Sequence, residues 1–271
     1  MNAYEFISQL QILKPDVVLV GSWGEILQPH LLTPDTPLMI NCHPSKLPAH
    51  RGANPYSSVI RTGEPETGVT FHRMAPQIDA GPIILQRAFP LNDWETGDSL
   101  REKCAQTAQN MVPELVQLLH DHLHNGATLP MQEQDPSQKS YFPQLKAEDG
   151  AIDWKSSIEA LSQQLRGLFP WVACYGILEN RHTVLFYDPK LVDLDPQTSS
   201  SSPPPMPGTI LSHERGVIRI ALNTPQTVLE VSQYQFGKPG QPTYWPLWLS
   251  RFRGPFILRP GLRFITSKAK S

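Results

Sequence analysis

Residues 38–43 read Leu-Met-Ile-Asn-Cys-His, a short apolar strand that runs directly into two polar side chains, Asn41 and His43. Residues 17–21, Val-Val-Leu-Val-Gly, form an earlier run of the same β-branched, apolar kind. Continuous apolar runs of this length are typical of strands that are buried on both faces of a parallel sheet. A helical pattern at residues 4–13 precedes both runs. The alternation of helix and strand predicts an α/β domain.

The chain divides into two predicted domains. Residues 1–133 continue with further strands and a long helix at 99–124, which predicts a partial doubly wound, mostly parallel sheet. Residues 134–146 are polar with few apolar anchors, so we expect them to form a linker. Residues 147–271 open with a helix at 156–168 and continue in short alternating stretches, which predicts an OB-like β-barrel.

Composition sets broad limits on function. The chain has 271 residues, of which 39% are hydrophobic and 18% charged, and its formal net charge is −2; these values suit a folded protein with real cores. Its three cysteines, Cys42, Cys104 and Cys174, are far apart and odd in number, which argues against a disulfide framework or a thiolate metal site. We find no secretory signal and no apolar stretch long enough to span a bilayer. We therefore expect a cytoplasmic protein with no membrane partner, and a monomer by default.

The C-terminal part of the chain is basic. From Val231 to the end there is no Asp or Glu, while Lys and Arg recur. Charge alone leaves two interpretations open, a solvated terminus or a surface for an anionic partner such as RNA. Tyr234, Trp245 and Trp248 could stack on unpaired bases or pack in a core. On the RNA interpretation the candidate contacts are Arg51, Lys238, Arg251, Arg253 and Arg259, although Arg51 could instead be a structural partner for a carboxylate.

Three polar residues stand where strands are expected to end. Asn41 and His43 follow the strand at 38–40, and Asp79 comes after a predicted strand at 69–71. Ligands bind outside the carboxyl ends of strands in open α/β sheets, so the three side chains can share one cleft. Such a set suits acyl transfer to an amine: the amide donates to an oxyanion, the imidazole exchanges a proton, and the carboxylate orients the imidazole and favours its protonated form. Spacing alone favours the plainer interpretation, a loop asparagine, a surface histidine and a turn aspartate.

The neighbouring residues reverse that preference. Residues 41–52, Asn-Cys-His-Pro-Ser-Lys-Leu-Pro-Ala-His-Arg-Gly, resemble the N-x-H-P-S-x-L-P-x-x-R-G signature of the folate-dependent formyltransferases. Residues 63–70 match that family's G-[ED]-x-x-T-G-V-T stretch, and residues 78–83 match its L-D-x-G-x-[IL] loop. Several matches in the same order make the resemblance specific.

The resemblance implies roles for particular residues. Asn41, His43 and Asp79 take the places of the family's catalytic Asn, His and Asp, with 10-formyltetrahydrofolate as the formyl donor and no metal. The folate slot would lie between the turn after the first strand, where Trp23 departs from the usual pattern, and the main chain of the loop that carries Asp79. The implied folate contacts are Ser22, Trp23, Gly24, Ser45, Leu47, Pro48, Gln77, Ile78, Ala80 and Gly81.

The second half of the chain carries family landmarks too. Residues 151–154 and 165–171 resemble the I-D-W and R-x-x-x-P-W motifs that open the family's C-terminal barrel, and we expect Trp154 and Trp171 to pack in a core. The branch of the family that formylates methionyl-tRNA has this appended domain, as do some sugar formyltransferases. The resemblance therefore implies formyl transfer to the α-amine of methionyl-tRNA, in support of translation initiation, with charged initiator tRNA as partner. An N-formyltransferase that acts on an amino sugar nucleotide is the alternative.

The family's catalytic domain has several βα units before the strand that corresponds to residues 17–21. Here a single helix precedes that strand, so we expect the chain to lack the early strands. This expectation keeps open a third interpretation, a truncated, non-catalytic relative that binds RNA. His120, His122 and His124 lie in a helical pattern, where an exposed helix end is a simpler interpretation than a metal site.

Overall fold

The computed structural model contains two compact units, and each is described by itself. Unit 1 comprises Met1–Val59 and Glu64–Gln144, and unit 2 comprises Ile60–Gly63 and Leu145–Ser271. The structure describes residues 8–10, 12–24, 27, 29–32, 37–194, 203–240 and 257–266. No helix in these described ranges is long and apolar enough to cross a membrane.

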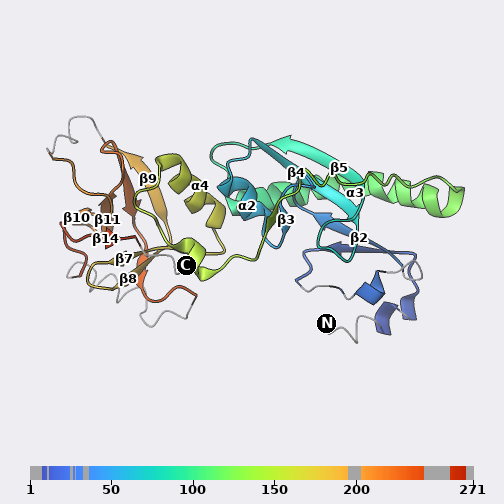
Figure 1. Ribbon diagram of the computed structural model, residues 1–271, viewed down its shortest axis with the longest axis horizontal. Coiled ribbons are helices and arrows are strands. Elements are labelled where there is room, and N and C mark those ends of the chain that lie inside the picture. Colours follow the sequence, from blue (N-terminus) through green and yellow to red (C-terminus); the bar gives the residue numbers. More distant parts are fainter. Residues whose placement is uncertain are drawn as a thin grey trace. The chain divides into compact units, whose positions relative to one another are not determined.

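A four-stranded mixed sheet forms the centre of unit 1 (Figure 1). Its order is β1 (Val17–Gly21), β2 (Leu38–His43), β4 (Glu66–Arg73) and β5 (Ile83–Pro90). β1 and β2 are parallel as predicted, but β4 is antiparallel to both β2 and β5. The α/β fold is therefore confirmed, and the expectation of a mostly parallel sheet is corrected for the described strands, because the direction of a short apolar run is not encoded in its composition.

The strands of this sheet differ in burial. Every residue of β4 from Thr67 to His72 is buried, as expected for a strand covered on both faces. β1 is an edge strand of the described sheet, and its Leu19 is 50% exposed. The prediction that the Val17–Gly21 run is buried on both faces is therefore wrong.

Helices pack beside the sheet. α3 (Gly97–Asn125) lies against β4 and β5 and buries Leu100, Cys104, Met111 and Leu115. It begins at a capping box, in which the Thr96 hydroxyl accepts from the Ser99 amide and the Ser99 hydroxyl accepts from the Thr96 amide. The remaining short helical elements of this region are α2 (Pro55–Arg61), the 3₁₀ turn η1 (Pro29–Leu31) and helical turns at residues 8–10 and 12–13.

The segment expected to be a linker instead packs on unit 1. β6 (Tyr141–Phe142) pairs in parallel with β3 (Arg51–Gly52). Ile83 and Gln132 exchange both of their backbone hydrogen bonds, at 2.8 and 2.9 Å. Two polar side chains of the segment, Gln134 and Ser140, hydrogen-bond to other parts of unit 1. The division between the two units falls after Gln144.

Unit 2 begins with the 3₁₀ turn η2 (Ala147–Gly150) and helix α4 (Ile158–Leu168), followed by two antiparallel four-stranded sheets, which confirms the predicted barrel-like domain. One sheet has the order β10-β11-β12-β9 and the other has the order β13-β8-β7-β14. The strands are β7 (Cys174–Leu178), β8 (Thr183–Phe186), β9 (Pro189–Asp193), β10 (Ile210–Glu214), β11 (Val217–Ala221), β12 (Thr227–Val231), β13 (Tyr234–Phe236) and β14 (Phe264–Ile265).

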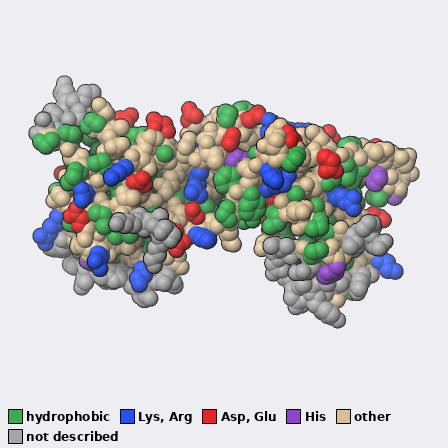
Figure 2. Space-filling view, viewed as in Figure 1, with side chains coloured by type: hydrophobic (Ala, Val, Ile, Leu, Met, Phe, Trp, Pro, Cys, Tyr) green, Lys and Arg blue, Asp and Glu red, His purple; other side chains and the backbone are tan. Residues whose placement is uncertain are grey.

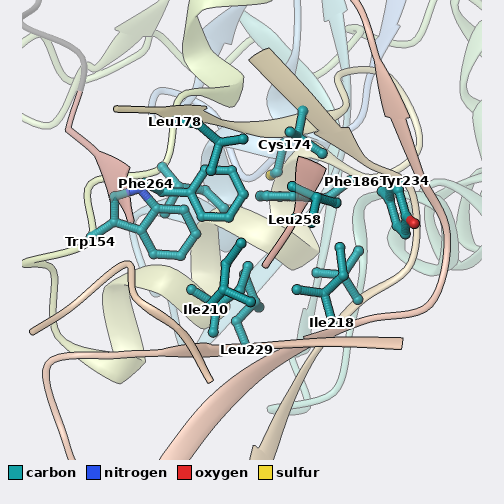
Figure 3. Packing of buried hydrophobic residues seen from close by; sticks show 14 of the residues in the cluster. Trp154, Cys174, Leu178, Phe186, Ile210, Ile218, Leu229, Tyr234, Leu258 and Phe264 are labelled. Atoms are coloured by element: carbon teal, nitrogen blue, oxygen red, sulfur yellow. The ribbon is translucent and has the colours of Figure 1, made fainter. Parts of the chain in front are cut away.

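An apolar core fills unit 2 (Figure 3). Trp154 stacks on Phe264 with ring centroids 5.2 Å apart, and Phe186 meets both rings edge-on. Trp154 is 2% exposed, which confirms its predicted place in the core. Trp171 is 40% exposed, so the same prediction for this residue is wrong.

Candidate active site

Asn41, His43 and Asp79 converge in unit 1. The Asn41 amide Nδ2 donates to Asp79 Oδ1 at 3.2 Å, and His43 Nδ1 lies 3.5 Å from Asp79 Oδ2. Asn41 and His43 are two residues apart on β2, so their side chains leave the same face of the strand. The predicted convergence is confirmed, but its expected cause is not, because β4 is antiparallel and Asp79 is instead brought to β2 by the loop that turns back after β4.

Asp79 is held by main-chain and side-chain partners. Its Oδ2 accepts from the Gly52 amide at 2.9 Å, and its backbone has a φ of 52°, in the left-handed region that few non-glycine residues adopt. Its own carbonyl accepts from the side-chain amide of Gln134 at 2.8 Å. Gly52 has a φ of 107°, and a Cβ there would collide with the Phe142 carbonyl oxygen, so glycine is needed at this point of the signature.

His72 is a fourth polar member of the site, which the sequence analysis missed. It pairs with Asn41 across the β2–β4 ladder, and its Nε2 lies 3.3 Å from Asn41 Nδ2 and 3.5 Å from Asp79 Oδ1. Its side chain is 2% exposed. The available signal was the histidine that follows Val69-Thr70-Phe71 in a predicted buried strand, because a buried polar side chain needs a partner.

His43 is buried, and this sets its charge. Burial lowers the pKa of His43 below its usual 6.5, and this outweighs the opposite effects of Asp79 and of the His50 carbonyl, so the ring is neutral at pH 7. Asp79 favours the protonated form of this imidazole, as expected, but in the free protein the effect of burial is larger. His43 Nε2 lies 2.9 Å from the His50 carbonyl oxygen. A carbonyl only accepts, so the proton is assigned to Nε2, and Nδ1 presents its lone pair beside Asp79.

Asp79 is ionised. Burial by itself would raise the pKa of Asp79, but the neighbouring His72 and His43 rings and the hydrogen bond from the Gly52 amide together lower it. At neutral pH the site therefore combines a carboxylate with a neutral imidazole, and the carboxylate stabilises any positive charge that forms on His43.

These residues open into a cleft of about 710 Å³, within the size range of small-molecule sites. Of the implied folate contacts, Ser22, Trp23, Gly24 and Ile78 line this cleft. Ser45 and Leu47 do not line it: they are 0% and 2% exposed, and the Ser45 hydroxyl donates to the Ala49 carbonyl. Pro48, Gln77, Ala80 and Gly81 also lie outside its lining.

Two further cleft residues bear on the chemistry. Burial raises the pKa of Cys42 to about 11 and that of Tyr56 to about 12, so both are protonated at neutral pH and Cys42 is a poor nucleophile. All three cysteines are free. Among the described residues, no group of three or more His, Cys, Asp or Glu side chains is arranged to hold a metal ion.

The candidate RNA contacts lie in different settings. Lys238 and Arg259 are exposed on unit 2, whereas Arg251 and Arg253 lie outside the described residues. The Arg51 guanidinium donates to the Gln134 side-chain oxygen at 2.7 and 3.1 Å, which favours a structural role. Tyr234 is 3% exposed and pairs with His213, so stacking on RNA bases is wrong for this residue. On the face drawn in Figure 2, acidic and basic side chains are interspersed over the described surface.

Comparison with known proteins places the chain in a family. Residues 2–116 match the family profile described as formyl transferase, and residues 144–245 match that of the formyl transferase C-terminal domain. The chain belongs to the formyl transferase family. The methionyl-tRNA formyltransferase of Citrifermentans bemidjiense is 34% identical over 257 residues, which cover 95% of this chain and 74% of that relative. The methionyl-tRNA formyltransferase of Thermotoga maritima is 32% identical over 69% of this chain and 58% of that relative.

Solved structures share the fold at lower identity. HypX from Aquifex aeolicus, solved in complex with tetrahydrofolic acid, has a TM-score of 0.68 and 15% identity, covering 93% of this chain and 40% of that one. A 4-N formyltransferase from Francisella tularensis has a TM-score of 0.55 and 23% identity, covering 69% of this chain and 76% of that one. These likenesses support the fold alone.

Proposed function

We propose that this protein transfers the formyl group of 10-formyltetrahydrofolate to the α-amine of methionyl-tRNA. The observation that carries the proposal is the convergence of Asn41, His43 and Asp79 on one cleft, since these three are the groups that acyl transfer to an amine needs. Membership of the formyl transferase family and the names of the 30–34% identical relatives support the same reaction and the same acceptor.

The cleft suits a folate-derived donor. Its walls combine apolar side chains, such as Val20, Trp23 and Ile78, with the polar trio at one point, which is the usual make-up of a site for a flat heterocyclic ligand. Trp23 and Ile78 are 41% and 40% exposed, so both offer apolar surface to a ligand. In this arrangement Trp23, Gly24 and Ile78 would contact the folate, which supplies the formyl group.

His43 Nδ1 is the base of the proposed reaction. It carries a lone pair at neutral pH, because burial keeps the ring neutral and the His50 carbonyl holds the single proton on Nε2. Nδ1 takes a proton from the acceptor amine as nitrogen bonds to the formyl carbon. The resulting imidazolium lies 3.5 Å from the Asp79 carboxylate, which stabilises the new charge. The proton is then available for the departing nitrogen of the donor.

Asn41 would stabilise the formyl oxygen as it becomes negative. Its Nδ2 lies within reach of both Asp79 Oδ1 and His72 Nε2 in the free protein. One of the two N–H bonds must therefore turn to the substrate oxygen, and we assign the bond toward His72, because the bond to the carboxylate is the stronger of the two.

The two rival functions receive less support. Three solved N-formyltransferases whose descriptions mention a sugar or an amino sugar nucleotide match with 17–21% identity and TM-scores of 0.52–0.56, which carries no argument about substrate. A non-catalytic RNA-binding role gives no reason for a buried trio arranged for proton transfer. The chain spans 58–75% of the length of four related methionyl-tRNA formyltransferases. Because these relatives are longer, their acceptor, methionyl-tRNA, is proposed for this chain and is not established by the likeness.

The test is acceptor discrimination with radiolabelled 10-formyltetrahydrofolate. We expect label on methionyl initiator tRNA and none on a dTDP-linked amino sugar. Label on the sugar nucleotide alone would overturn the choice of acceptor. Label on neither, from a protein that binds tRNA, would support the non-catalytic alternative.

A further inference from the structure

The segment between the two family matches contacts the groups that hold the catalytic side chains. Residues 134–142 lie after the first match, which ends at 116, and before the second, which starts at 144. They run beside the signature motif: the Arg51 amide donates to the Ser140 carbonyl at 3.0 Å, and the Ala53 amide donates to the Phe142 carbonyl at 3.3 Å. Side chains of this segment contact the main chain of Asp79 directly, and they contact His50, whose carbonyl is bonded to His43.

The first contact is made by Gln134. Its Nε2 donates to the carbonyl oxygens of Asp79 and Gly81 at 2.8 and 2.7 Å. Its Oε1 accepts from Nε and Nη2 of Arg51 at 3.1 and 2.7 Å, which fixes the orientation of the amide. Asp79 has a φ of 52°, a left-handed backbone conformation that is unfavourable for a non-glycine residue. Gln134 therefore restrains the main chain of Asp79, and this main-chain conformation places the carboxylate beside His43.

The second contact passes through His50. The His50 carbonyl accepts from His43 Nε2 at 2.9 Å, and His50 itself has a φ of 60°. The segment restrains His50 twice, because the Ser140 hydroxyl accepts from the His50 amide at 2.8 Å and Phe142 stacks on its ring with centroids 5.1 Å apart and planes 9° apart. The Nδ1 atom of the ring lies 2.9 Å from the Ser58 hydroxyl oxygen.

We propose that Gln134, Ser140 and Phe142 together form a positioning segment of the active site, in which Gln134 sets the Asp79 carboxylate, while Ser140 and Phe142 set the His50 carbonyl that keeps the proton of His43 on Nε2. The proposal rests on the proposed function only in treating His43 and Asp79 as catalytic. Gln134 and His50 are positioning residues, since they act through Asp79 and His43. A displacement of about 1 Å in a reacting group can cost roughly a hundredfold in rate, so small shifts here have large effects.

The first experiment compares Gln134→Leu with Gln138→Leu. Gln138 is an exposed glutamine of the same segment, and its side-chain amide donates to Asp135. We expect Gln134→Leu to lower kcat for formyl transfer by at least about tenfold with KM for tRNA within twofold, and Gln138→Leu to leave both within twofold. Equal kcat values in the two folded variants would overturn the Gln134 part of the proposal.

The second experiment reads the His43 tautomer by ¹³C and ¹⁵N NMR in the ligand-free 271-residue chain. We expect a single Nε2–H tautomer in the wild type, a mixture in His50→Ala, and an intermediate result in His50→Asn, because asparagine tolerates the left-handed backbone better than alanine does. A pure Nε2–H tautomer in all three would overturn the His50 part. Since this measurement needs no turnover, a tautomer change in a protein that transfers no formyl group would support the positioning segment and refute the proposed function.

Discussion

The two units bury different kinds of side chain. Among the described residues, the buried polar and charged side chains are all in unit 1 except Gln235, and they include His43, His50 and His72. The buried cluster of unit 2 is apolar and centres on rings such as Trp154 and Phe264. Burying a polar group costs free energy unless it is hydrogen-bonded, and two of these groups, His43 and His72, line the cleft beside Asp79.

The comparison assigns separate tasks to the units. Each buried histidine of unit 1 has a hydrogen-bond or ion-pair partner that constrains its orientation. Two of these contacts involve the proposed catalytic residues directly: His50 bonds to His43 through its carbonyl, and His72 lies beside Asp79. Unit 2 gains its stability from ring and aliphatic packing. Substitutions in the unit 1 network should therefore change rate more than stability, and substitutions in the unit 2 core should do the reverse.

The largest expected effect is on rate, from Asp79→Asn. The substitution removes the charge that stabilises the His43 imidazolium, so we expect kcat/KM for formyl transfer to fall by about 10²–10⁴-fold. Asp135→Asn is the matched control, because Asp135 is an exposed aspartate that accepts from Ser137 and Gln138. Comparable activity in the two variants would remove Asp79 from the mechanism.

The counterpart in unit 2 is Phe264→Ala. Phe264 is 1% exposed and contacts Trp154 and Phe186, so its truncation should lower the free energy of unfolding of this unit by about 3–5 kcal/mol in a urea titration. The neighbouring Ile265 is 38% exposed, and Ile265→Ala should cost far less. Equal losses in the two variants would show that the ring cluster is not the core that holds unit 2 together.

An NMR titration of His43 should place its pKa below 6.5, and lower still in Asp79→Asn, because the carboxylate is the main group that opposes the effect of burial. The sign for stability follows. The unfolded chain has the higher pKa and takes up the proton first, so the free energy of unfolding should decrease as the pH falls from 6.5 toward the folded pKa. A folded pKa at or above 6.5 would show that burial does not outweigh the opposite effects of Asp79 and the His50 carbonyl.

The smallest expected effect concerns tRNA binding by the basic C-terminal region. Replacing Arg251, Arg253 and Arg259 by Gln should reduce the dependence of log Kd on log salt by roughly two to three units, if each contacts a phosphate. The matched triple variant replaces Lys155, Arg181 and Lys190, exposed cations of unit 2 outside that region. A slope that changes equally in both variants, or in neither, would exclude a special role for the basic region.

Much of the site was predictable from the sequence, for a local reason. Asn41 and His43 sit two residues apart after an apolar run, so a strand of any direction places them on one face. The direction of β4 was not predictable, because alternation and burial do not depend on it. The role of residues 134–142 was not predictable either: their polar side chains form bonds to residues more than 50 positions away, and composition alone cannot separate such bonds from hydration.

His72 and Trp171 also show that single residues cannot be placed from the sequence when their surroundings come from distant parts of the chain. A lone histidine in an apolar strand indicates a buried partner, but the partner, Asn41, is 31 positions away. Trp171 follows a helix and a proline, and its hydrophobicity predicted burial, whereas the chain there leaves the ring 40% exposed.

The central claim is that unit 1 carries out formyl transfer with His43 as the base. The most direct measurement is single-turnover transfer from 10-formyltetrahydrofolate to methionyl initiator tRNA at pH 7 by the wild type, by His43→Ala and by His122→Ala, the last an exposed histidine on α3. The account predicts label on the tRNA for the wild type and His122→Ala, and a rate about 10²–10⁴-fold lower for His43→Ala. Equal rates in the two histidine variants, or no transfer by the folded wild-type chain, would contradict it.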